Sequence, residues 1–289
     1  MDFGRLITAM VTPFDADLQV DEAQVEKLVN YLIEEQQSDS IVVCGTTGES
    51  PTLTDEEKIR LFQLVVKAAY GRCKVIAGTG SNNTAHSIHL TEEAEKCGVD
   101  GILLVAPYYN RPTQEGMYQH FKAIADSTSL PIMLYNIPKR TGVHLTVETT
   151  VRLAQIPNIT STKEASADLD QMTKIAAMTD DSFKVYSGDD NLALPCLAVG
   201  GYGVVSVSGH VVGRQMKQMI NNYLSGNVME ASKQHSELLD ILTGMFICPN
   251  PVPVKYALSL HGVPVGGVRL PLVEANELEK EFIRQLFAV

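Results

Sequence analysis

The sequence predicts a (β/α)8 barrel with a C-terminal helical appendage, and three observations carry that prediction. Eight short runs rich in β-branched and aliphatic residues recur along the chain, beginning roughly 20 to 35 residues apart. Segments with apolar residues at helical spacing fill the gaps, as the crossovers of a parallel sheet require. Eight such units occupy about 225 residues, which is the size of this barrel.

Four of the eight expected strands end in polar residues. In a barrel of this kind, the residues that follow the strands form the active-site face, so functional residues are expected at these ends. The expected strands, in chain order, are RLITAMV from Arg5, SIVVC from Ser40, KVIAG from Lys74, GILLVA from Gly101, PIMLY from Pro131, ITSTK from Ile159, FKVYS from Phe183 and GVVSV from Gly203.

Two segments show the helical pattern between strands most clearly. Thr54-Asp55-Glu56-Glu57 is a capping-box sequence, and it precedes an apolar side formed by Ile59, Leu61, Phe62, Leu64, Val65 and Val66. The segment that begins at Asp21 has one apolar face, formed by Val25, Leu28, Val29, Leu32 and Ile33. Both segments are expected to be crossover helices of the barrel.

The last part of the chain reads as helices rather than further βα units. We expect helices over Ala231 to Met245 and Pro271 to Phe287. No linker rich in Pro, Gly or Ser precedes this part, so it is expected to pack on the barrel. The prediction is a catalytic barrel over residues 1–226 and a helical region over residues 227–289.

A doubly wound Rossmann fold is the rival, and the glycine patterns disfavour it. That fold needs G-x-G-x-x-G after its first strand, whereas Gly78-Thr79-Gly80 continues without the third glycine. Gly45-Thr46-Thr47-Gly48 is not a P-loop either, because no Gly-Lys-Ser/Thr follows. Neither a dinucleotide nor a nucleotide cofactor is predicted.

Composition excludes several partner classes. The 289 residues carry a formal net charge of −11, which disfavours a general grip on nucleic acid or anionic lipid. The stretch from Asn191 to Gly213 has no formally charged residue and is long enough to span a bilayer, but five glycines, Pro195 and several polar residues break it into two short elements. No nucleic-acid or membrane partner is expected.

The cysteines and the first residues predict a cytoplasmic protein. Five widely spaced cysteines include no C-x-x-C pair, so they read as reduced thiols rather than as a zinc or redox motif. The first ten residues lack the basic patch and long apolar core of a secretory signal.

Two strand ends carry polar residues suited to binding. The second strand leads into Gly45-Thr46-Thr47-Gly48-Glu49-Ser50, whose hydroxyls and backbone N–H groups suit a small carboxylate; the alternative is a plain glycine turn. The fifth strand ends in Tyr135, which is either a functional hydroxyl or a packed aromatic with a wet hydroxyl.

The sixth strand end is the most informative, because it delivers a lysine. Lys163 follows Ile159-Thr160-Ser161-Thr162 directly, so its side chain would point into the barrel mouth. An unprotonated amine there can attack a carbonyl and form a Schiff base. The alternative is a solvated loop lysine.

Other catalytic signatures are weak or missing. His86 and His89 lie three residues apart without an H-E-x-x-H motif, so a surface pair is favoured over a metal site. The sequence contains no G-x-S-x-G nucleophile elbow. No metal ligands are predicted.

Taken together, five motifs resemble those of the dihydrodipicolinate synthase family within the pyruvate-dependent lyase superfamily. They are GTTGES at Gly45, PYYNRP at Pro107, YNIPxRTG at Tyr135, KEAS at Lys163 and SGDD at Ser187. They lie on successive strands, and the resemblance spans nearly the whole chain. It implies condensation of pyruvate with L-aspartate 4-semialdehyde to 4-hydroxy-tetrahydrodipicolinate, a step toward diaminopimelate and lysine, with no metal or cofactor.

The resemblance also assigns the catalytic residues. Lys163 would form the Schiff base with pyruvate, and Tyr135 would donate and accept protons beside it. Thr46 would relay protons between Tyr135 and Tyr109, and Tyr109 would come from a neighbouring subunit. A homo-oligomer, either a dimer or a tetramer, is therefore implied.

The remaining implied residues bind the substrates. Thr47 and the adjoining backbone would hold the pyruvate carboxylate, and the Val205 main chain would line the same pocket. Gly188 and Asp189 would lie near the mouth, and Arg140 would bind the carboxylate of the second substrate through its bidentate fork.

The sequence leaves two alternative functions open. The chain could be a relative that cleaves a sugar acid, such as N-acetylneuraminate or 2-keto-3-deoxygluconate, or a non-catalytic binding barrel. Arg140 favours the synthase. The sequence departs from the common family pattern at Lys139 and at Ser208-Gly209-His210.

The resemblance also bears on feedback inhibition by L-lysine. In inhibited relatives a carboxylate receives the ammonium group of the effector, and this sequence has His86 at that position, with Lys58 nearby. We therefore expect weak or absent inhibition. The positions that match the effector site are Ser50, Pro51, Asp55, Lys58, Asn82, His86 and Tyr108.

Overall fold

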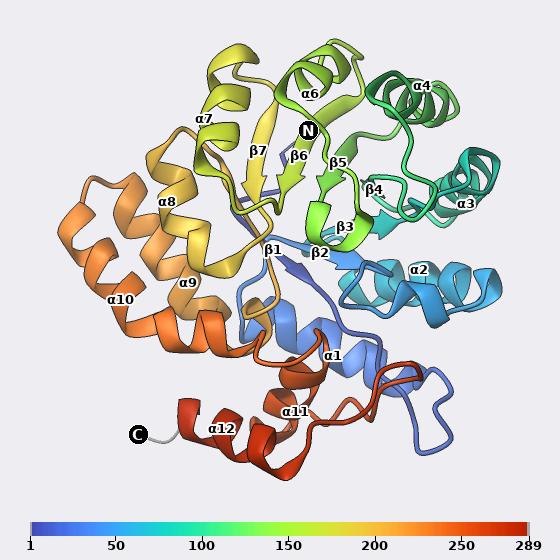
Figure 1. The fold of residues 1–289 in the computed structure, drawn as a ribbon. Coiled ribbons are helices and arrows are strands. Elements are labelled where there is room, and N and C mark those ends of the chain that lie inside the picture. The colour runs from blue at the N-terminus through green and yellow to red at the C-terminus, as the bar shows by residue number, and fades with distance from the viewer. Residues whose placement is uncertain (1, 288–289) are drawn as a thin grey trace.

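The computed structural model describes residues 2–287, and its centre is a closed barrel of parallel strands (Figure 1). Each strand pairs with its neighbours in the chain, and β8 closes on β1 through pairs such as Val205 with Ile7. The strands are β1 (Leu6–Ala9), β2 (Ser40–Val43), β3 (Lys74–Gly78), β4 (Gly101–Val105), β5 (Ile132–Asn136), β6 (Ile159–Glu164), β7 (Lys184–Ser187) and β8 (Gly203–Ser206). The predicted fold class is confirmed.

Helices surround the barrel, as Figure 1 shows. One helix follows most strands, while β5 is followed by two and short 3-10 turns precede α2 and α8. The elements of this ring are α1 (Glu22–Glu34), η1 (Ser50–Thr52), α2 (Asp55–Ala69), α3 (Thr84–Lys96), α4 (Gln114–Ala125), α5 (Pro138–Thr141), α6 (Val147–Leu153), α7 (Leu169–Met178), η2 (Asp190–Leu192), α8 (Ala193–Ala198) and α9 (Gly209–Leu224).

The two helices predicted most clearly begin where the sequence indicated. The Asp21 side chain caps α1 by accepting a hydrogen bond from the N–H of Gln24. At α2 the capping box is complete, because Thr54 accepts from the Glu57 N–H and the Glu57 carboxylate accepts from the Thr54 N–H. Local hydrogen bonding therefore sets both helix starts.

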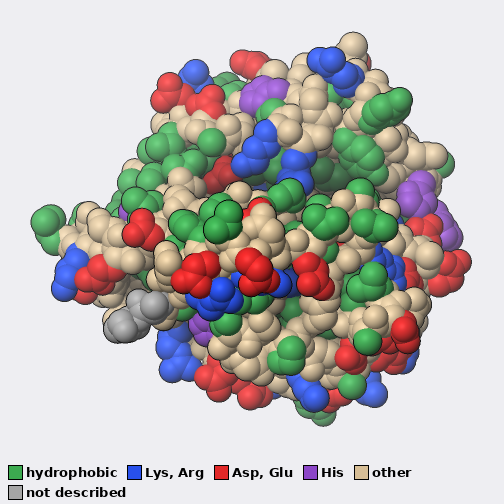
Figure 2. Space-filling view, turned by 60° about the horizontal axis from the view of Figure 1, so that its bottom comes forward, with side chains coloured by type: hydrophobic (Ala, Val, Ile, Leu, Met, Phe, Trp, Pro, Cys, Tyr) green, Lys and Arg blue, Asp and Glu red, His purple; other side chains and the backbone are tan. Residues whose placement is uncertain are grey.

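The C-terminal part consists of α10 (Val228–Gly244), α11 (Val252–Leu260) and α12 (Glu277–Phe287), which lie together beside α9 and α1 in Figure 1. The expected start of the last helix at Pro271 is wrong. Asn276 accepts hydrogen bonds from the N–H groups of Leu278 and Glu279, so the helix begins only after this cap. On the face that Figure 2 turns forward, on the side of α11 and α12, acidic and basic side chains are interspersed.

The uncharged stretch over residues 191–213 is divided among α8, β8 and the start of α9. Across residues 2–287, no helix combines the length and apolar character that a membrane span needs. The stretch is broken as expected, but the expectation of two short elements is wrong, because the end of η2 and the start of the 16-residue α9 also lie in it.

Strand alternation separates two apolar cores. Val42 points into the barrel, whereas Ile41 and Val43 pack outward against the helices. Phe3 closes the N-terminal end of the barrel, where a Cβ on Gly101 would come within 2.5 Å of its ring. The open end is therefore the one at which the strands finish.

Candidate active site

A cavity of about 380 Å³ lies at the C-terminal ends of the strands and contains the predicted lysine. Lys163 reaches it from β6, where its neighbours in register are Tyr135 on β5 and Tyr186 on β7. Only 5% of Lys163 is exposed, and its Nζ lies 4.3 Å from the centroid of the Tyr135 ring. No carboxylate within residues 2–287 forms an ion pair with this amine. Lys163 is therefore a buried amine with an aromatic neighbour, not a solvated loop lysine.

Gly188 makes room for the lysine stem. A Cβ at this position would come within 3.0 Å of Lys163 Cε and 2.6 Å of Ala165 Cβ. Any side chain here would displace the aliphatic part of Lys163. The glycine is thus a packing requirement of the buried amine as well as part of the cavity lining.

The residue after the lysine fixes β6 from outside. Glu164 accepts hydrogen bonds from Asn136 Nδ2 and Gln171 Nε2, and it has no exposed surface. Burial raises the pKa of the Glu164 carboxyl, and these hydrogen bonds counteract that shift. Because neighbouring residues of a strand point to opposite faces, the fixed Glu164 directs Lys163 inward.

The turn after β2 supplies two hydroxyls. Thr46 and Thr47 both line the cavity, and the turn is closed by hydrogen bonds from the N–H groups of Gly48 and Ser50 to the Gly45 carbonyl. The Thr47 hydroxyl accepts a hydrogen bond of 2.9 Å from Asn250 Nδ2. The turn is therefore a built structure and not a flexible glycine loop.

A buried ion pair anchors the same turn. Glu49 and Lys255 are joined at 2.8 Å, and their side chains are only 1% and 3% exposed. Burial lowers the pKa of Lys255 to about 8, against the opposing effect of the Glu49 charge. Glu49 also accepts from the Arg269 N–H, so three segments of the chain meet at this carboxylate.

Three charged residues, Lys139, Arg140 and Asp189, face the mouth. Arg140 lines the cavity with an exposed side chain, and its guanidinium forms no ion pair with any carboxylate in the described part of the chain. Asp189 pairs with Lys139 at 3.2 Å, so the departure at Lys139 gives the mouth an ion pair. Arg140 remains available to an anionic ligand.

The departure at Ser208-Gly209-His210 has a structural explanation. His210 Nδ1 lies 2.8 Å from the Val207 carbonyl, and Nε2 accepts from the Val11 N–H. Burial lowers the pKa of His210 to about 4, so the ring is neutral and links the ends of β8 and β1. Asp190, also buried, accepts from the N–H groups of Val207 and Ser208.

Two predicted residues lie outside the cavity. Val205 has no exposed surface and points into the barrel core, while Val207, two residues later, lines the cavity. Tyr109 is 90% exposed, adopts a left-handed backbone conformation (φ 73°) and lines neither large cavity of this chain. Its predicted role depends on a second subunit.

One wall of the cavity was not predicted from the sequence. The segment Phe246–Asn250, between α10 and α11, crosses the mouth and lines it opposite the strand ends. The only local signal was Pro249-Asn250-Pro251, a proline-bounded asparagine. The helical appendage therefore contributes directly to the site.

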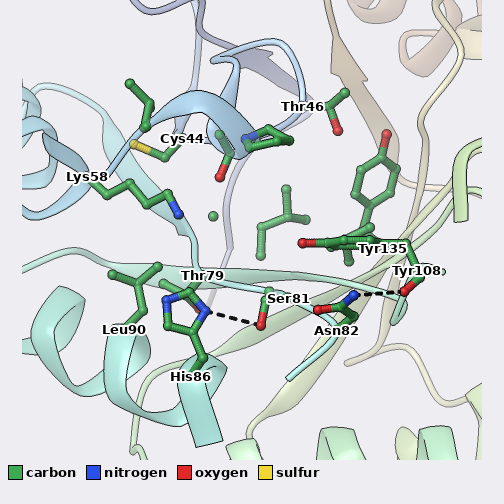
Figure 3. A pocket seen from close by; sticks show the side chains of 18 of the residues that line it. Cys44, Thr46, Lys58, Thr79, Ser81, Asn82, His86, Leu90, Tyr108 and Tyr135 are labelled. Carbon is green, nitrogen blue, oxygen red and sulfur yellow. Dashed lines mark hydrogen bonds between the residues drawn. The ribbon is translucent and has the colours of Figure 1, made fainter. Parts of the chain in front are cut away.

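A second cavity of about 600 Å³ adjoins the first and shares Thr46, Tyr135 and Arg140 with it. Lys58 and His86 lie at its other end, on α2 and α3 (Figure 3). Asp55 pairs with both, at 2.8 Å from His86 Nε2 and 3.5 Å from Lys58 Nζ. His86 therefore turns into a cavity instead of forming the expected surface pair with His89.

Among residues 2–287, no three His, Cys, Asp or Glu side chains are grouped closely enough to hold a metal ion. The chemistry that the cavity offers is that of its own groups. It combines a buried primary amine, a phenol beside it, two hydroxyls and a guanidinium at the mouth. This set suits an oxo acid that reacts as an imine.

Comparison with known proteins agrees with this reading. A family model described as the Dihydrodipicolinate synthetase family matches residues 2–288. The 4-hydroxy-tetrahydrodipicolinate synthase of Bacillus subtilis (strain 168) is 58% identical over 281 residues, which cover 97% of each chain.

Solved structures are equally similar. A dihydrodipicolinate synthase from Bacillus anthracis superimposes with a TM-score of 0.97 at 53% identity, over 99% of this chain and 98% of that one. An enzyme of the same name from Cyanidioschyzon merolae, with lysine bound, gives a TM-score of 0.96 at 47% identity, over 98% and 97% of the two chains. The chain thus belongs to the dihydrodipicolinate synthase family.

Proposed function

We propose that this chain is an enzyme that condenses pyruvate with L-aspartate 4-semialdehyde to give 4-hydroxy-tetrahydrodipicolinate, in the pathway to diaminopimelate and lysine. One observation carries the proposal. The Lys163 amine is buried at a strand end, pairs with no carboxylate in the described chain, and lies against Tyr135. Family membership supports the choice of substrates.

The first half of the reaction takes place on Lys163. Its amine attacks the ketone carbon of pyruvate, and loss of water leaves an imine. The protonated imine draws electrons from the adjacent methyl group, so a methyl proton leaves and an enamine forms. Tyr135, whose ring lies 4.3 Å from the amine, is placed to carry protons in these steps.

The carboxylate of pyruvate needs donors close to Lys163. The turn after β2 supplies the Thr47 hydroxyl and backbone N–H groups, and it is held in place by the Glu49–Lys255 ion pair. Hydrogen bonds to a charged carboxylate are stronger than those between neutral groups. We assign this turn to the carboxylate of the first substrate.

The second substrate enters at the mouth. Its carboxylate is assigned to Arg140, whose guanidinium has no ion-pair partner in residues 2–287. The enamine carbon attacks the aldehyde carbon and forms the new C–C bond. The amine of the second substrate then replaces the lysine nitrogen at the imine carbon, which closes the ring and frees Lys163.

Borohydride trapping tests the proposal. Reduction of the enzyme in the presence of pyruvate should attach a three-carbon acid to Lys163, identified by peptide mass mapping. Lys163→Arg should give no adduct and no turnover, because guanidinium stays protonated. Lys174→Arg, on the surface helix α7, is the matched control and should trap normally. An adduct on another lysine, or none in the unmodified enzyme, overturns the mechanism.

A substrate panel distinguishes the synthase from its sugar-acid-cleaving relatives. The unmodified enzyme should consume pyruvate in the presence of L-aspartate 4-semialdehyde. Faster release of pyruvate from N-acetylneuraminate or 2-keto-3-deoxygluconate would assign the chain to the cleaving enzymes instead. Both reactions would still label Lys163, so this test addresses the substrate alone.

The proposed enzyme is a homo-oligomer in which Tyr109 acts in the neighbouring subunit. Its 90% exposure in the single chain supports this role. Mixing inactive Tyr109→Phe and Lys163→Ala chains should restore part of the activity, because a hybrid dimer contains one complete site. If activity does not return, Tyr109 does not act across an interface.

We place the reaction in the cytoplasm. The five cysteines form no disulfide in the described structure, and three of them are buried thiols. This state fits a reducing compartment. Localisation of a tagged chain in a cell fraction tests this assignment.

A further inference from the structure

The segment that closes the cavity brings one amide against the substrate-binding turn. Asn250 Nδ2 lies 2.9 Å from Thr47 Oγ1 although the two residues are 203 positions apart. Both side chains are buried, with 8% and 2% exposure, and both line the cavity that contains Lys163. This is the one side-chain hydrogen bond formed by Thr47 with any residue in the range 2–287.

The chemistry of the two groups sets the direction of this bond. Asn250 faces Thr47 with Nδ2, which can only donate, so the Thr47 oxygen is the acceptor, while Asn250 Oδ1 is buried with no partner among the described residues. The hydroxyl hydrogen has no acceptor among the described residues, so it is left to point into the cavity. A hydroxyl constrained in this way is a donor toward whatever binds there.

The position of Asn250 is fixed independently of this hydrogen bond. Lys255, five residues later, forms the buried ion pair with Glu49, two residues after Thr47. The Val252 N–H also bonds to the Pro249 carbonyl at the start of α11. The ion pair joins the Asn250 segment to the Thr47 turn, and the Val252 bond fixes the local backbone around Asn250.

We propose that Asn250 is a positioning residue for substrate binding. By donating to Thr47 Oγ1, it makes the Thr47 hydroxyl donate to the carboxylate of the oxo acid on Lys163. This inference rests on the proposed function, because it requires an acid bound at Lys163. It adds a residue from the C-terminal helices to the machinery that holds the first substrate.

Changing Asn250 to aspartate reverses the direction of the hydrogen bond, while the side chain keeps nearly the same size. Above the pKa of the new carboxyl, the aspartate can only accept, so Thr47 must donate to it and offers only its lone pairs to the substrate. The substrate carboxylate would also meet a second negative charge. At lower pH the protonated aspartic acid can donate to Thr47 again, and the native arrangement returns.

The measurement is the pyruvate concentration that half-saturates borohydride trapping of Lys163, taken from pH 5.5 to 8.5. For Asn250→Asp, we expect this concentration to exceed that of the unmodified enzyme by about tenfold or more at pH 8. The ratio should fall toward one as the pH decreases. Because the rescue occurs within one folded variant, damage to folding cannot imitate it.

A double-mutant cycle tests whether Asn250 acts through Thr47. Asn250→Leu should weaken pyruvate binding in the native background but add little in a Thr47→Val background, because the hydroxyl to be oriented is gone. An equal effect in both backgrounds means that the two residues act separately, and this overturns the inference.

The control is a second asparagine that binds backbone at the other end of the barrel. Asn158 Nδ2 donates to the carbonyls of Ala125 and Thr128. Asn158→Asp should lower the unfolding temperature but leave the half-saturating pyruvate concentration unchanged at every pH.

The inference is overturned if Asn250→Asp has no effect or an effect that does not depend on pH. Trapping in the unmodified enzyme would still support the proposed function in that case. Absence of trapping in the unmodified enzyme overturns both.

Discussion

The two adjoining cavities differ in whether their lysine has a carboxylate partner, and not only in size. In the cavity of about 600 Å³, Lys58 lies 3.5 Å from Asp55, which also pairs with His86. In the smaller cavity of about 380 Å³, Lys163 pairs with no carboxylate in residues 2–287 and lies against an aromatic ring.

This difference supports the choice of Lys163, and not Lys58, as the proposed reacting amine. Lys58 is engaged by the Asp55 carboxylate, whereas Lys163 lies against the Tyr135 ring with no carboxylate partner among residues 2–287. The larger volume therefore does not mark the reaction site, and the pairing of the lysine does.

The largest effect on activity is predicted for Tyr135, and Tyr108 serves as its control. Tyr135 lines both cavities and lies beside Lys163, whereas Tyr108 lines only the larger one. Tyr135→Phe should lower kcat by about a hundredfold, the usual size of a general acid–base contribution. Tyr108→Phe, the matched control, should change kcat little. Similar losses in steady-state assays of both variants would remove the proposed distinction between the cavities.

The second prediction concerns the arginine shared by both cavities. Arg140→Ala should raise the KM for L-aspartate 4-semialdehyde by about tenfold or more, because a charge-assisted bidentate contact is lost. Half-saturation of borohydride trapping by pyruvate should change little. Lys139→Ala is the control, since Lys139 already pairs with Asp189 and should affect KM less. If both substrates weaken equally, Arg140 supports the cavity as a whole.

The third prediction is that L-lysine inhibits weakly or not at all. Burial alone would raise the pKa of Asp55, but the hydrogen bond from His86 and the charge of Lys58 bring the pKa below its ordinary value. This carboxylate is therefore ionised and already engaged. An incoming ammonium group would meet Lys58 and lose hydration without a free counter-ion.

Titration of L-lysine into a steady-state assay checks this prediction. His86→Glu adds a second carboxylate to the larger cavity, so L-lysine should inhibit this variant more strongly than it inhibits the unmodified enzyme. Saturable inhibition of the unmodified enzyme at submillimolar L-lysine would show that the paired charges do not exclude an ammonium ligand.

The last prediction concerns stability rather than activity, at the support beneath the smaller cavity. The pKa of His210 is lowered to about 4 by burial, against an ordinary value near 6.5. Between these values the unfolded chain binds more protons, so the free energy of unfolding falls as the pH decreases from about 6.5 to about 4. The full contribution of one such group is about 3 kcal/mol. His120, with a pKa also lowered to about 4 by burial, acts in the same window.

Unfolding temperatures at pH 7 and pH 5 measure this contribution. His210→Asn should lose less stability on acidification than the unmodified protein, because one of the histidines whose pKa is lowered by burial is removed. His89→Asn, at an exposed position on α3, should behave like the unmodified protein. Equal acid sensitivity in all three proteins would contradict the assignment to His210.

The sequence predicted the barrel and the strand-end residues because both depend on local patterns. Apolar runs, a capping box at Thr54 and a lysine after a strand are each visible within a few residues. The barrel topology then places Tyr135 and Lys163 side by side, since adjacent parallel strands end together.

The residues missed by the sequence depend on long-range packing. Asn250 meets Thr47 across 203 positions, and no periodic signal connects them. Val205 lies within β8, whereas Val207 follows the end of the strand, where Asp190 accepts from its N–H, and the apolar run alone does not show where the strand ends. The expected helix start at Pro271 was wrong because a cap at Asn276 decides it.

The wall formed by Phe246–Asn250 has a consequence for synthesis of the protein. The ribosome makes the chain from its N-terminus, so all eight barrel strands are complete by Ser206, before Asn250 has been added. A nascent chain that has closed its barrel still lacks the donor to Thr47 and the lysine that pairs with Glu49. The substrate pocket is therefore completed only after translation has passed Lys255, and a partly made chain with a finished barrel is not yet a finished enzyme.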